Sequence, residues 1–115
     1  MIKINGKIIE FTYYYKFKNK GKYIIEYSFK KNLTKTCYMF EDCKSLTNLN
    51  LSNFNTQNVT DISYMFCGCK SLKELKMNSL ETNNKINMND MFLGCTKEFQ
   101  TKMKCEFKNL KKEAF

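Results

Sequence analysis

Residues 38–46 read YMFEDCKSL and residues 64–72 read YMFCGCKSL, so one phrase returns after 26 residues. A third, partial copy, DMFLGC, stands at residues 90–95 with the same spacing. A fixed period of about 20–50 residues is typical of proteins built from stacked units, none of which can bury its apolar face alone. We therefore predict a short repeat array, an architecture that mostly serves to bind other molecules.

Each 26-residue unit is predicted to contain one strand and one short helix. The strand is indicated by L-x-x-L-x-L spacing, at Leu46, Leu49 and Leu51 and again at Leu72, Leu75 and Met77. The helix is indicated by apolar residues at i, i+3 and i+4, namely Ile62, Met65 and Phe66, and again Met88, Met91 and Phe92. A left-handed residue is expected after each helix, at Asp42, Gly68 and Gly94.

The segments on either side of the repeat are predicted to cap it. Before the repeat, Asn5-Gly6 indicates a first hairpin. Alternating apolar residues predict a second hairpin with one buried face. Its two strands carry Phe11, Tyr13, Tyr15 and Phe17, and Tyr23, Ile25, Tyr27 and Phe29. After the repeat, Thr96 suits the N-cap of an amphipathic helix carrying Phe99, Met103, Phe107, Leu110 and Ala114. Such a basic helix can also bind a membrane or a partner, but the open end of a stack has to be covered.

The predicted fold class is an α+β repeat, a short leucine-rich-repeat-like solenoid with a β-strand and a short helix in each unit. Its parts are an N-terminal antiparallel β cap over residues 1–31, repeats over residues 32–95 and a C-terminal amphipathic helical cap over residues 96–115. With 115 residues in all, these parts are expected to form one folded unit with a modest core.

The formal net charge is +9, and all 20 basic residues are lysine. A positive charge of this size favours acidic partners, including nucleic acid and anionic membranes. Base readout and bidentate phosphate recognition depend largely on arginine, however, and the lysines are scattered along the chain. We therefore expect a protein partner, and keep electrostatic binding of nucleic acid or anionic lipid as the second alternative.

The chain has no apolar stretch near the ~18 residues of a transmembrane helix, and its start, MIKINGKIIEF, lacks the apolar run of a secretory signal. These features predict a cytoplasmic protein whose six cysteines are thiols.

Three cysteines recur with the repeat, at Cys43, Cys69 and Cys95. A column of buried thiols is the leading interpretation. Disulfides would need an oxidising compartment, and zinc would need histidines or C-x-x-C motifs that are absent, so we predict no metal and no cofactor.

Asparagine also recurs, at Asn32, Asn58 and Asn84, where its side chain is expected to hydrogen-bond to the backbone of the turns.

The sequence offers few groups for catalysis, because the chain has no histidine to act as a general base. It also lacks a converging carboxylate pair in the repeat and a glycine-rich phosphate loop. We therefore predict a protein without enzymatic activity.

The outward face of the predicted strands is the candidate binding surface. Its polar side chains alternate with inward leucines and repeat across neighbouring strands; they are Asn48, Asn50, Ser52, Glu74, Lys76 and Asn78. A rigid, repeated polar face suits recognition of an extended protein partner. The competing interpretation is that these side chains are simply solvated.

Residues 43–72, CKSLTNLNLSNFNTQNVTDISYMFCGCKSL, resemble the repeat of the BspA-like leucine-rich repeat surface proteins found in bacteria, mycoplasmas and protozoa. That unit has the form L-x-x-L-(D/N)-L-S-x-F-(N/D)-T-x-N-V-T-(D/N)-M-S-x-M-F-x-x-C, which the chain matches from Leu46 to Cys69 with Ile62 in place of the common methionine. The second unit is further from the pattern, since Lys85-Ile86-Asn87 replaces V-T-D. The resemblance implies a non-catalytic solenoid that acts in adhesion or protein interaction, often at a cell surface. A cell-surface adhesin is therefore the first alternative, and the oligomeric state stays open.

Overall fold

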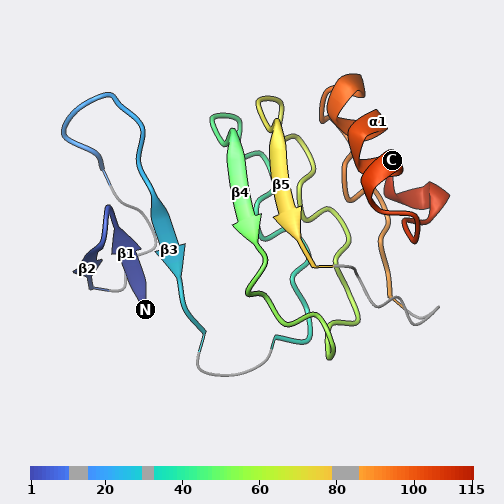
Figure 1. Cartoon of the computed structure of the whole chain (residues 1–115), viewed down its shortest axis with the longest axis horizontal. Coiled ribbons are helices and arrows are strands. Elements are labelled where there is room, and N and C mark those ends of the chain that lie inside the picture. The colour runs from blue at the N-terminus through green and yellow to red at the C-terminus, as the bar shows by residue number, and fades with distance from the viewer. Residues whose placement is uncertain (11–15, 30–32, 79–85) are drawn as a thin grey trace. The chain divides into compact units, whose positions relative to one another are not determined.

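The computed structural model describes residues 1–10, 16–29, 33–78 and 86–115. The chain divides into two compact units, Met1–Asn32 and Leu33–Phe115. The first unit carries a three-stranded sheet, and the second carries a two-stranded sheet and an α-helix (Figure 1).

The predicted leucine-rich-repeat-like solenoid is wrong. The described residues form two small, separate sheets with one α-helix, and not a strand and a helix in every unit followed by a helical cap. The segments expected to be short helices are successive turns. Their backbones turn left-handed at Tyr38, Tyr64 and Asp90, with φ of 60°, 54° and 51°, and such residues interrupt a right-handed helix. The i, i+3, i+4 spacing led to the wrong prediction of short helices, because the turns bury the same residues that a helix would have buried.

The first unit is a sheet of three short antiparallel strands, β1 (Ile2–Ile4), β2 (Lys7–Ile9) and β3 (Ile25–Tyr27), in the order β2-β1-β3. The predicted Asn5-Gly6 turn joins β1 to β2. Both turn residues have positive φ, 47° and 80°, as the hairpin turn favoured by Asn-Gly requires. The Asn5 side chain also accepts a hydrogen bond from the Ile24 backbone at 2.9 Å, which ties the turn to the start of β3.

The prediction that the second hairpin buries an apolar face is wrong for the residues that can be described. Ile25, Tyr27 and Phe29 are exposed, Phe17 and Tyr23 are only half-buried with ring centroids 4.1 Å apart, and no described residue of this unit is fully buried. Three strands of three residues each enclose too little space for a core. Phe11, Tyr13 and Tyr15, together with Asn32 and Asn84 of the predicted asparagine column, lie outside the described residues.

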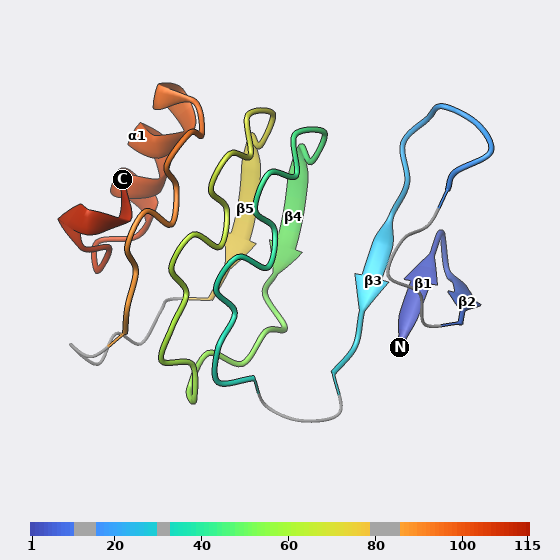
Figure 2. The same ribbon diagram turned by 180° about the vertical axis from the view of Figure 1, so that it is seen from behind.

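In the second unit, β4 (Asn48–Leu51) and β5 (Glu74–Met77) pair in parallel, with Asn48 opposite Glu74 and Leu51 opposite Met77. The alternation predicted for these strands is observed, because Leu75 is buried and Leu49 is half-buried while their neighbours are exposed. Viewed from behind, the turn segments that precede β4, β5 and the helix lie side by side (Figure 2).

Backbone hydrogen bonds join these turn segments. The Phe40 and Phe66 N–H groups donate to the carbonyl oxygens of Met65 and Met91, at 2.9 and 3.0 Å. The predicted left-handed residues are confirmed at Asp42, Gly68 and Gly94, with φ of 54°, 73° and 78°. An added Cβ at Gly68 would meet the Asp42 carboxylate, which would have to move, and the positive φ of Gly68 also favours glycine at this position.

The core of the second unit is built around stacked phenylalanine rings. Ring centroids are 5.8 Å apart for Phe40 and Phe66, 5.6 Å for Phe66 and Phe92, and 5.5 Å for Phe92 and Phe115. The rings are accompanied by fully buried apolar side chains from the same turns: Ile62, Met65, Leu72, Met88 and Met91. The phenylalanines therefore connect all three turn segments to the C-terminal residues.

Helix α1 (Lys97–Glu106) begins as predicted, since the Thr96 side chain accepts a hydrogen bond from the Phe99 N–H at 3.2 Å. The expected continuation to Ala114 is wrong, because α1 ends at Glu106 and a 3-10 helix, η1 (Lys112–Ala114), follows. This break lets the last residues reach the neighbouring turn. The carbonyl oxygens of Glu113 and Ala114 accept from the N–H groups of Asp90 and Phe92, at 2.7 and 2.8 Å.

Replacing Phe66 by alanine is expected to lower the free energy of unfolding by about 3–5 kcal/mol, the usual cost of truncating a core aromatic residue. Phe66 is fully buried and packs between two other rings. Urea denaturation followed by circular dichroism measures the change. Phe66→Leu, which keeps most of the volume, is expected to retain the fold, and Phe29→Ala is the exposed control. A loss below about 1 kcal/mol for Phe66→Ala would contradict this packing.

Candidate functional site

The predicted binding residues lie on or beside the two parallel strands of the second unit. Asn48 and Asn50 on β4 stand opposite Glu74 and Lys76 on β5, and all four side chains are exposed. Side chains paired across neighbouring strands share one face of the sheet. We call these four residues the β4–β5 polar face.

Ser52 and Asn78 lie at the ends of the same strands and mainly stabilise the turns. The Asn50 Oδ1 atom accepts hydrogen bonds from the Ser52 N–H at 3.0 Å and from the Ser52 hydroxyl at 2.6 Å. The Asn78 amide donates to the Ser52 carbonyl oxygen at 2.5 Å, which bridges the two strand ends. Ser52 is half-buried by these contacts. Asn48 and Lys76 are therefore the members of the predicted set best placed to contact a partner.

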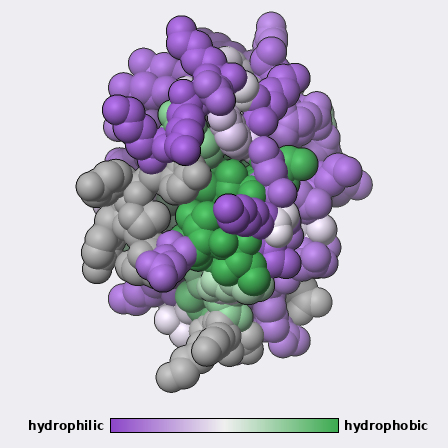
Figure 3. Space-filling view, turned by 90° about the vertical axis from the view of Figure 1, so that its left-hand side faces the viewer, coloured by the Kyte–Doolittle hydropathy of each residue, from purple (hydrophilic) through white to green (hydrophobic). Residues whose placement is uncertain are grey.

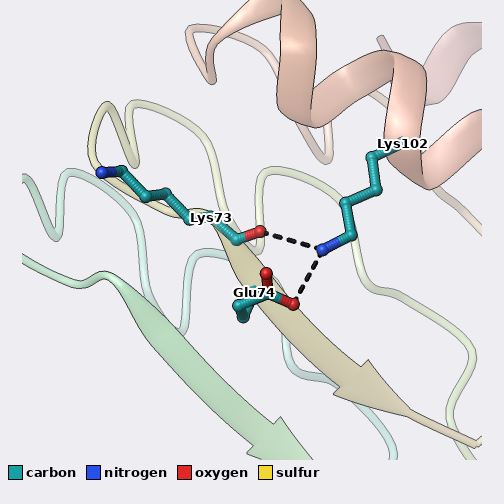
Figure 4. A network of polar contacts seen from close by, with 3 residues as sticks. All are labelled: Lys73, Glu74 and Lys102. Atoms are coloured by element: carbon teal, nitrogen blue, oxygen red, sulfur yellow. Dashed lines mark hydrogen bonds and ion pairs between the residues drawn. The ribbon is translucent and has the colours of Figure 1, made fainter.

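Helix α1 adds a charge that sequence reasoning missed. Lys102 Nζ lies 2.7 Å from the Glu74 carboxylate and 3.4 Å from the Lys73 carbonyl oxygen (Figure 4). The hydrogen bond to Glu74 raises the pKa of Lys102. Both side chains are well exposed, so the pair contributes little to stability. The effect of the pair is confined to this edge of the polar face, where the Glu74 carboxylate points toward Lys102 of α1.

Of the three recurrent cysteines, Cys69 and Cys95 are buried and contact the neighbouring turn, whereas Cys43 is half-buried. The Cys69 thiol donates to the Phe40 carbonyl oxygen at 3.0 Å, and the Cys95 thiol donates to the Phe66 carbonyl oxygen at 3.3 Å. Burial raises the pKa of Cys69 to about 12 and that of Cys95 to about 11. Neither thiol ionises at neutral pH, and the thiolate is the form that acts as a nucleophile or metal ligand.

A second group of titratable side chains lies on the turns. The Tyr38 and Tyr64 rings stack with centroids 4.9 Å apart, and a hydrogen bond to the Asp90 carboxylate raises the pKa of Tyr64. Burial, helped by nearby Glu41, raises the pKa of Cys67. Among the residues that the structure describes, no three His, Cys, Asp or Glu side chains are grouped to hold a metal ion.

Residues 11–113 match the model of the family described as "Mycoplasma protein of unknown function, DUF285". This chain belongs to that family. The match supports the family resemblance drawn from the sequence, though it does not extend to the leucine-rich repeat motif itself. No curated protein and no solved structure shows a significant match. In the described part of the chain, no helix is long and apolar enough to cross a membrane.

The thiol pKa values predict how stability changes at alkaline pH. An ordinary thiol pKa is 9.0, whereas those of Cys69 and Cys95 in the folded protein are about 12 and about 11. The folded protein therefore holds more protons than the unfolded chain above about pH 9, and the free energy of unfolding falls as the pH rises through this window.

Urea titrations from pH 8 to pH 11 measure this fall. It should be smaller in Cys69→Ala than in the unchanged protein, while Cys105→Ala, at an exposed position, should leave it unaltered. Equal slopes in all three proteins would mean that Cys69 ionises normally in the folded state.

Proposed function

We propose that this protein is a non-enzymatic protein-binding module, and that its contact surface is the β4–β5 polar face. The observation that carries the proposal is the register of the two strands, which places Asn48 beside Glu74 and Asn50 beside Lys76. Amide, carboxylate and ammonium groups thus stand side by side on two hydrogen-bonded strands. Such a surface can hydrogen-bond to an extended polypeptide through several neighbouring groups at once.

Two features favour this face over the rest of the unit as the contact surface. Its inward side chains are anchored in the core, since Leu75 is buried beneath it, so little ordering would be required on binding. The Lys102–Glu74 pair also adds a positive charge beside this face. The partner expected from this pattern is a protein segment rich in polar groups.

Replacing Asn48 and Lys76 together by alanine is expected to weaken partner binding at least about tenfold, as for side chains at the centre of an interface. Asn50 is left in place because its side chain closes a turn. The matched control is Lys108→Ala with Asn109→Ala, which removes the same residue types at exposed positions outside the face.

Binding is measured by affinity capture from host lysate and from host cell-surface fractions, with captured proteins quantified by mass spectrometry. Melting temperatures of both double variants should stay close to that of the unchanged protein. Capture that is equally strong with all three proteins would refute the polar face as the contact surface. A large drop in melting temperature for the Asn48 and Lys76 variant would show that these residues are structural.

A second candidate function is adhesion at the cell surface. Membership of a Mycoplasma family favours it, together with the resemblance to the BspA-like surface proteins. This candidate uses the same polar face but places it outside the cell, where the partner would be a host or matrix protein.

The state of the six cysteines in the native host separates the two settings. All six are free thiols in the structure, and Cys105 is exposed. An intracellular module should yield six reactive thiols when the endogenous protein is denatured and titrated, because the cytoplasm keeps cysteines reduced. An adhesin should be recovered by surface biotinylation of intact cells. Recovery only from the lysate, with every thiol reduced, would rule out the adhesin.

A further inference from the structure

The first unit leaves several apolar side chains of its sheet exposed to solvent. Residues paired across its strands share a face, and Ile2 pairs with both Ile9 and Tyr27, while Ile4 pairs with Ile25. We call this surface the isoleucine–tyrosine face. Ile2, Ile4 and Ile9 of this face are half-buried, whereas Ile25 and Tyr27 are 42% and 53% exposed, and Phe29, next in the same alternation, is 52% exposed. Figure 3 shows one side of the molecule, where a hydrophobic area is bordered by hydrophilic residues.

This unit is also basic. Its described residues include six lysines and two glutamates, a formal excess of four positive charges. Four of the lysines lie in the exposed segment that leads into β3: Lys16, Lys18, Lys20 and Lys22. Lys7 stands opposite Ile4 and so belongs to the isoleucine–tyrosine face itself. Exposed apolar side chains and positive charge are thus combined in a short stretch of chain.

We propose that the isoleucine–tyrosine face docks onto the surface of an anionic lipid bilayer. The isoleucine, tyrosine and phenylalanine side chains enter the region between headgroups and acyl chains, where amphipathic aromatic rings are favoured. The lysines contact acidic headgroups, and the two contributions add, as they do for other peripheral membrane proteins. This site is separate from the β4–β5 polar face and would attach the protein to a membrane without a transmembrane helix.

Charge and apolarity together select this occupant. Nucleic acid would be bound by the lysines but would leave exposed isoleucines such as Ile25 in water. A second copy of the chain would cover the apolar face, but it would bring one basic unit against another, and like charges oppose such pairing. An anionic bilayer satisfies both the apolar side chains and the lysines.

Co-sedimentation of the full chain with lipid vesicles tests the proposal. Binding to phosphatidylcholine vesicles containing about 30% phosphatidylglycerol should be at least about tenfold stronger than binding to pure phosphatidylcholine. Sodium chloride at about 0.5 M should weaken it severalfold, because screening shortens the reach of the lysines. Binding that is absent, or equal for both lipids, would overturn the proposal.

Two pairs of variants locate the site. Tyr27→Ser with Phe29→Ser should reduce binding to the anionic vesicles at least about fivefold, because it removes the apolar contribution. Met39→Ser with Leu93→Ser, which changes two exposed apolar residues of the second unit, should leave binding unchanged. Lys20→Gln with Lys22→Gln should weaken binding, whereas Lys97→Gln with Lys108→Gln should have a smaller effect.

Three results would assign the face to another occupant and overturn the proposal. Vesicle binding that survives loss of Tyr27 and Phe29 but falls with any lysine would indicate unspecific electrostatic attraction. A dimer in analytical ultracentrifugation that Tyr27→Ser with Phe29→Ser converts to monomer would assign the face to a second copy. Duplex DNA that displaces the protein from vesicles, and binds the serine variant equally well, would assign the lysines to nucleic acid.

Discussion

The arrangement of the second unit depends on the stacking of Phe40, Phe66, Phe92 and Phe115. Neighbouring rings lie 5.5–5.8 Å apart, close to the spacing between hydrogen-bonded backbones. The phenylalanines also contribute to the backbone contacts, because the N–H groups of the first three donate to carbonyl oxygens of the following segment. Ring packing and backbone hydrogen bonding thus join the same neighbouring segments, and the parallel pairing of β4 with β5 extends this stacking to the sheet.

The C-terminal residues are part of this arrangement because α1 ends early. An uninterrupted helix to Ala114 would carry the chain away from the turns. With the break after Glu106, the carbonyl oxygens of Glu113 and Ala114 reach Asp90 and Phe92, and the Phe115 ring stacks on Phe92. Two backbone donors of the last turn, the N–H groups of Asp90 and Phe92, are thereby satisfied within the chain.

The two units use apolar residues in opposite ways. In the second unit, apolar side chains from three turns converge on one core, and the exposed polar face of β4 and β5 has the buried Leu75 beneath it. In the first unit, the strands are too few and short to enclose a core, and Ile25, Tyr27 and Phe29 are exposed. The proposed protein-binding face and the proposed lipid-binding face therefore lie on different units of the same short chain.

The 26-residue period, the Asn5-Gly6 turn, the Thr96 cap, the left-handed residues and the outward alternation along β4 and β5 could all be read from the sequence. Each of them depends on neighbouring residues or on a regular spacing. The sequence did not decide between helix and turn at Ile62–Phe66, because both conformations bury the same side chains, and only the hydrogen bonds between turns select the left-handed Tyr64. Tertiary structure likewise decided that Tyr27 is exposed, that α1 stops at Glu106 and that Lys102 meets Glu74. These outcomes depend on contacts between residues far apart in the chain, for which local sequence patterns carry no signal.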